Sequence, residues 1–118
     1  MKLIQRIRQL PAGTVIPKPA AKQDFIVKGW GKRRGEAALI YFIPNHSDPS
    51  KPHQKGITES EWNLAIDQLM EGELTKAWFT EKLGACAKEG DCNFTTIGGI
   101  LCLLGAASRE GRGVYRIK

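Results

Sequence analysis

The chain has few of the residues that cross-link a fold, ligate metals or anchor a protein in a membrane. It holds three cysteines and two histidines among 118 residues. A small, odd number of cysteines does not build a disulfide framework and is typical of reduced thiols in a cytoplasmic protein. No apolar run approaches the ~20 residues of a transmembrane helix. The start of the chain, with Arg6 and Arg8, lacks the apolar stretch of a signal peptide. We therefore expect a cytoplasmic protein with no membrane partner.

Motifs for metal binding and catalysis are also missing. Cys86 and Cys92 lie six positions apart, whereas zinc sites use closer cysteine pairs. His46, Asp48 and His53 lie in a polar stretch whose histidine spacing matches no standard zinc pattern. No glycine-rich nucleotide-binding motif is present. An enzyme would have to assemble these histidines, the aspartate and a cysteine from separate loops, so we expect no catalytic activity, no cofactor and no metal.

Positive charge is concentrated in the first half of the chain. The net charge is +6, and residues 1–57 carry eleven Lys and Arg against three acidic residues, whereas residues 58–118 carry seven against nine. A basic surface attracts nucleic acid by its charge alone. Any basic surface is therefore expected to be mostly N-terminal.

The first half of the chain is predicted to contain one helix and one β-hairpin. Met1–Leu10 has apolar residues at near-helical spacing, and Pro11–Lys22 is expected to be a loop because it contains three prolines. Two β-rich runs over Asp24–Pro44 surround a glycine-bracketed turn, as in a hairpin. Asn45–Gly56 is polar and contains proline, so it is predicted to be a linker.

The tip of the predicted hairpin is basic. Lys32, Arg33 and Arg34 lie in its turn, and Lys28 and Trp30 come just before them. Cations beside an aromatic ring suit contacts with phosphates and bases. The alternative is a solvated turn whose charges keep the hairpin soluble.

Two helices are predicted to follow. Thr58–Gly72 begins with Thr-Glu-Ser-Glu, a capping box, and continues with apolar residues at helical spacing. Leu74–Leu83 has a second apolar face and Thr75 as its cap. Residues 84–93 are predicted to form a loop.

The last quarter of the chain combines a helix with a basic hairpin. Ile97, Ile100, Leu101 and Leu104 fall on one helical face, and a glycine follows them. Two strand-like runs, 106–109 and 114–117, are joined by Glu-Gly-Arg-Gly. Two glycines in that link supply the positive φ angles of a tight turn.

This ending resembles that of a winged helix-turn-helix domain, and Gly111–Tyr115 resembles the wing of gluconate-repressor-type bacterial regulators. The resemblance covers about a fifth of the chain. It implies an α+β fold with a winged-helix-like helical core over residues 58–118, a C-terminal β-wing and an additional N-terminal β-hairpin. Residues 1–118 are then a single domain, in which residues 1–57 form a basic N-terminal arm and the hairpin.

The resemblance also implies DNA binding, although the last helix has no side chain suited to reading bases. Residues 96–104 contain no charged residue and no amide, which are the groups that read base edges. We therefore expect contacts mainly to phosphates, with DNA preferred over RNA. The residues expected to make them are Lys28, Lys32, Arg33, Arg34, Thr95, Thr96, Arg109, Arg112 and Arg116. The alternative is a protein-interaction or homodimerisation module of the same fold.

Overall fold

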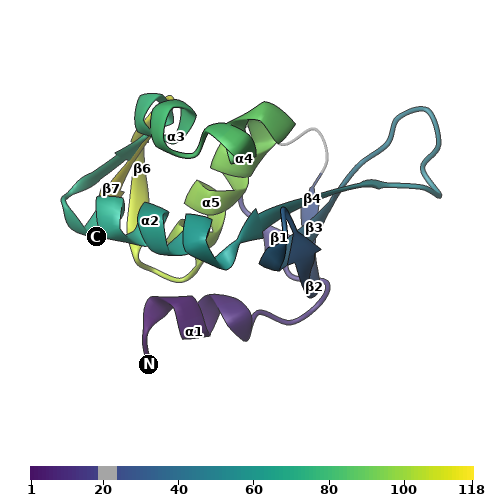
Figure 1. Cartoon of the computed structure of the whole chain (residues 1–118), viewed down its shortest axis with the longest axis horizontal. Helices are drawn as coiled ribbons and strands as arrows, with labels where there is room; N and C mark the ends of the chain where they lie inside the picture. The colour runs from purple at the N-terminus through teal and green to yellow at the C-terminus, as the bar shows by residue number, and fades with distance from the viewer. Residues whose placement is uncertain (19–23) are drawn as a thin grey trace.

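A curved antiparallel sheet forms one side of the molecule. The structure, a computed structural model, describes residues 1–18 and 24–118. The first sheet contains β1 (Val15–Ile16), β2 (Phe25–Arg33), β3 (Glu36–Ile43) and β4 (His53–Thr58), in the order β1-β2-β3-β4. The loop between β3 and β4 projects beyond the other elements (Figure 1).

The second sheet is built from the C-terminal half of the chain. It contains β5 (Glu73–Thr75), β6 (Ala107–Gly111) and β7 (Val114–Ile117), in the order β5-β7-β6. All of its pairs are antiparallel, and Leu74 lies opposite Tyr115. The hairpin formed by β6 and β7 is therefore joined to a strand from the middle of the chain.

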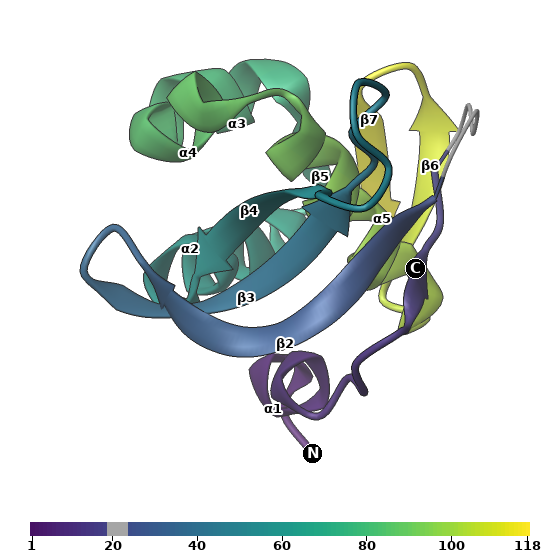
Figure 2. The same cartoon turned by 90° about the vertical axis from the view of Figure 1, so that its right-hand side faces the viewer.

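Helices surround the two sheets and connect them. They are α1 (Leu3–Arg8), α2 (Glu59–Met70), α3 (Lys76–Lys82), α4 (Gly84–Glu89) and α5 (Cys92–Leu103). Helix α1 contacts α2 and lies below β2 in Figure 2, whereas α3 and α4 lie at the top of that view. No helix among the described residues is long and apolar enough to cross a membrane.

One buried cluster unites both halves of the chain. It includes Ile7 and Leu39 from the N-terminal half and Trp62, Phe79 and Tyr115 from the rest. A buried hydrogen bond joins the two sides of this core, because the Tyr41 hydroxyl donates to Asn93 Oδ1 at 2.7 Å. Such a pair satisfies polar groups that would be costly to bury alone.

Several local predictions are confirmed. Thr58 and Glu61 form the predicted capping box at the start of α2, and Thr75 caps α3 by accepting from the N–H of Trp78. The hairpin of β2 and β3 is present, but Lys32 and Arg33, predicted to lie in its turn, belong to β2. The turn consists of Arg34 and Gly35, which both have positive φ angles. A two-residue turn of this kind matches the twist of the strands. Within the predicted loop over Pro11–Lys22, residues 15 and 16 form β1, and residues 19–22 lie outside the described residues.

The α+β composition agrees with the prediction, but the winged-helix-like architecture is wrong. A four-stranded curved sheet, rather than an accessory hairpin beside a helical core, makes up a large part of the molecule. The predicted linker 45–56 contains most of β4, whose first residues are polar and exposed and therefore lack a strand-like apolar pattern. The predicted loop 84–93 instead contains α4 and the start of α5.

Candidate functional site

Cationic side chains from separate segments surround a small hollow at one end of the second sheet. The hollow has a volume of about 180 Å³, and Lys76, Arg109 and Arg112 line it together with Thr95 and one acidic residue, Asp91. Lys76 begins α3, Thr95 lies in the first turn of α5, and the arginines belong to β6 and the turn that follows it. We call this site the cationic hollow.

Backbone hydrogen bonds hold the walls of the cationic hollow together. Thr75 pairs with Val114 across β5 and β7, and the N–H of Lys76 donates to the Gly113 carbonyl at 3.0 Å. Gly113 has a φ angle of 74°, a conformation that suits glycine because it has no Cβ. The turn between β6 and β7 is thus fixed against the start of α3, and Lys76 is held beside Arg112.

The cations of the hollow differ in their partners. Lys76 Nζ lies 2.9 Å from an oxygen of Asp91, but both side chains are at least half exposed, so the pair adds little stability. Arg109 and Arg112 are exposed, and neither forms an ion pair with a carboxylate of the described residues. These two guanidinium groups are available to an anion, and each can donate several hydrogen bonds to phosphate oxygens.

Arg116, on the same hairpin, has acidic neighbours. Its guanidinium lies 3.0 Å from an oxygen of Glu73 and 3.8 Å from one of Glu110. It does not line the cationic hollow. The two threonines expected to contact nucleic acid differ in exposure. Thr95 is half-buried and lines the hollow, whereas Thr96 is fully buried. Arg116 and Thr96 are therefore not part of this site.

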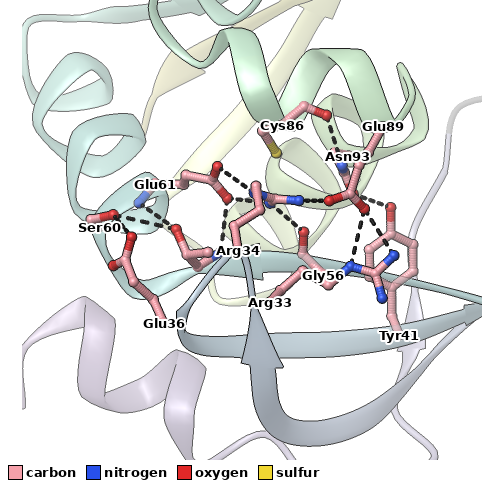
Figure 3. Close-up of polar contacts among 11 residues, drawn as sticks. Arg33, Arg34, Glu36, Tyr41, Gly56, Ser60, Glu61, Cys86, Glu89 and Asn93 are labelled. Atoms are coloured by element: carbon pink, nitrogen blue, oxygen red, sulfur yellow. Dashed lines mark hydrogen bonds and ion pairs between the residues drawn. The ribbon is translucent and has the colours of Figure 1, made fainter.

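The arginines at the tip of the first hairpin fold inward (Figure 3). Arg34 donates to both oxygens of Glu61, at 3.0 and 2.5 Å, and to the Gly56 carbonyl at 2.8 Å. It also forms an ion pair with Glu89. Arg33 donates from two nitrogens to the other oxygen of Glu89, Oε1, at 3.1 and 2.9 Å. These contacts tie the β2–β3 turn to α2 and α4.

The environment of Glu61 shows the strength of this network. Burial alone raises the pKa of Glu61, but hydrogen bonds from Arg34 and from the backbone of Thr58 outweigh it and hold that pKa below its ordinary value. Because the Arg34 side chain is only 19% exposed, a ligand at the surface would have little access to it. We therefore infer that Arg33 and Arg34 stabilise the fold and do not bind a ligand.

The two lysines of the first hairpin lie apart from the cationic hollow. Lys28 donates to the side chain of Gln54 at 3.1 Å, and Lys32 is exposed on β2. Of the residues expected to contact nucleic acid, the structure brings together Thr95, Arg109 and Arg112. Lys76 joins them although the sequence did not single it out, because its place beside the turn depends on the pairing of β5 with β7.

The cysteines and carboxylates form no candidate metal centre among residues 1–18 and 24–118. Cys86 is buried and not disulfide-bonded. Burial, followed by the nearby charge of Glu61, raises the pKa of its thiol to about 12. A thiol in that state is a poor nucleophile near neutral pH, because the thiolate is the reactive form.

Comparison of the chain with protein-family models, with curated proteins and with solved structures gives no match. The resemblance to winged helix-turn-helix regulators is thus neither supported nor refuted by relatives.

Proposed function

We propose that the protein binds nucleic acid, mainly through phosphate contacts in the cationic hollow. The observation that carries this proposal is the convergence of Lys76, Arg109 and Arg112 on one concave site, with both arginines outside any ion pair of the described residues. A phosphate group placed there would meet positive charge from two directions. The hydroxyl of Thr95 lines the same site and adds a hydrogen-bonding group.

The chemistry around the hollow favours phosphate over base contacts. In α5, the side chains that line the site are Phe94 and Thr95, and neither offers the paired donors and acceptors that distinguish bases. Phosphate contacts give affinity with little sequence preference, and they weaken as salt displaces them. A preference for DNA over RNA remains a prediction from the sequence.

Salt-dependent binding tests this proposal. Fluorescence anisotropy with labelled random-sequence DNA of about 20 nucleotides, single-stranded and duplex, measures affinity at roughly 50 and 200 mM salt. Arg112→Ala should weaken binding to all sequences alike and lower the slope of log affinity against log salt by about one. Its stability should change by less than about 0.5 kcal/mol, since Arg112 is exposed.

Arg116→Ala is the matched control. It removes an arginine from the same hairpin, but one that faces Glu73 and Glu110 and lies outside the hollow. Its salt slope should stay close to that of the wild type. Failure of the wild type to bind either form of DNA at low salt would contradict the proposed function.

The alternative, a protein-interaction module that uses the last helix, has less support. Ile97, Ile100 and Leu101 are buried in the core, so the apolar face of α5 is already covered by the chain itself. Leu103 is 44% exposed, and single exposed apolar residues are common on monomers. Loss of self-association on Leu103→Ser, measured by sedimentation, together with no DNA binding, would favour this alternative.

A further inference from the structure

A second hollow shares a wall with the cationic hollow. Arg109 and Tyr115 line both. The second hollow has a volume of about 200 Å³, and the other described residues that line it are Pro17, Lys18, Gly99 and Cys102. Carbon atoms make up most of its surface, so we call it the apolar hollow.

The close approach of two segments shapes the apolar hollow. A Cβ at Gly99 would lie 2.2 Å from the Pro17 carbonyl oxygen, so only glycine lets the chain after β1 pass this close to α5. Tyr115 is buried, and its position on β7 places the ring between the two hollows. Gly99 and Tyr115, which are both packed in the core, thus form part of the surface of the apolar hollow.

We propose that the apolar hollow accepts the base of an unpaired nucleotide whose phosphate lies in the cationic hollow. The ligand class is then single-stranded nucleic acid in preference to duplex. This inference rests on the proposed function, because the cationic hollow must first bind the phosphate.

The size and composition of the apolar hollow fit one planar ring. An apolar cavity of about 150 Å³ holds a benzene molecule, so 200 Å³ leaves room for a pyrimidine base. Arg109 stands between the sites and can contact a phosphate on one side and the face of a base on the other. In a duplex each base is paired and stacked inside, whereas an unpaired base is free to leave the backbone and enter such a hollow.

A variant that fills the apolar hollow separates base binding from phosphate binding. Cys102→Phe places a ring in the hollow and leaves every cation in place, and Leu103→Phe is its control, since Leu103 is exposed on the same helix but does not line the site. The probes are a thymidine oligonucleotide of about 12 nucleotides and a duplex of the same length. We expect Cys102→Phe to weaken single-strand binding roughly tenfold and to leave duplex binding unchanged. Leu103→Phe should change neither.

Alkylation of the wild type provides a test that does not depend on a variant folding. Cys102 and Cys92 are both partly exposed, but only Cys102 lines the apolar hollow. The thymidine oligonucleotide should slow the modification of Cys102 by iodoacetamide several-fold and leave Cys92 unaffected, as measured by peptide mass spectrometry. The duplex should protect neither cysteine.

The possible failures are distinguishable. Equal affinity for single strand and duplex, with no effect of Cys102→Phe and no protection of Cys102, would overturn this inference and leave the proposed function standing. Absence of binding to both forms at low salt would overturn both.

Discussion

The ring of Tyr115 lies directly on the backbone of Gly98. A Cβ at residue 98 would be 2.1 Å from Cε2 and Cζ of that ring, far inside the contact distance of two carbon atoms. This contact fixes β7 on α5. Because Tyr115 lines both hollows, the same contact positions one lining residue of each.

Replacing Gly98 with alanine should destabilise the protein. The added methyl group has to displace either the Tyr115 ring or α5, and overpacking of this kind costs about 1–3 kcal/mol. Urea denaturation measures the loss. Gly84→Ala is the control, because Gly84 is also helical and a Cβ there meets no atom within 4 Å. That variant should be neutral or slightly stabilised. Equal stability of the two variants would show that Tyr115 does not pack on Gly98.

Removing Arg34 should cost more than removing an exposed arginine. Arg34→Met leaves Glu61 and Glu89 without their shared partner in a mostly buried site, a change typically worth about 3–5 kcal/mol when one member of a buried pair is lost. Arg116→Met breaks an exposed pair with Glu73 and should cost less than about 1 kcal/mol. Chemical denaturation at neutral pH compares them. Similar small losses in both variants would mean that Arg34 does not hold the hairpin.

The difference in stability between wild type and Arg34→Met should shrink in acid. The pKa of Glu61 in the folded protein lies below its ordinary value of 4.5. Ionised Glu61 therefore stabilises the folded state above pH 4.5, and this stabilisation is lost as the pH falls through the lowered folded pKa. Without Arg34, burial would dominate and raise that pKa, so protonation of Glu61 would then favour folding. Unfolding free energies of both proteins, measured from about pH 7 down to about pH 3, test this. If the difference in unfolding free energy between the two proteins does not change with pH, Glu61 is not the source of that difference.

Local signals in the sequence were sufficient to predict several elements. The capping residues Thr58 and Thr75 mark the starts of α2 and α3 correctly, because a cap is a contact between neighbours three residues apart. The apolar stripe of α5 and the strands of both hairpins were also visible. Short or polar elements were missed, since β5 has three residues and β4 begins with exposed polar side chains.

The candidate site was only partly predictable, for a different reason. Arg109 and Arg112 stood out as cations on a hairpin, but their neighbour Lys76 lies more than thirty positions away and reaches them through the pairing of β5 with β7. The tip arginines Arg33 and Arg34 looked free because Glu61 and Glu89 approach them only in the folded chain. Contacts between residues that are far apart in the chain produce no periodic pattern in a single sequence, so they could not be predicted from it.

The most direct test of the phosphate site compares two double variants of equal net charge. Arg109→Gln with Arg112→Gln removes two cations from the cationic hollow, whereas Lys32→Gln with Arg116→Gln removes two that lie outside it. Both are titrated with the single-stranded thymidine oligonucleotide at low and high salt. The hollow variant should lose nearly all binding and about 1.4 units of salt slope, at ~0.7 per contact, while the control stays near wild type. Equal losses in the two variants would mean that overall charge, and not the cationic hollow, binds the nucleic acid.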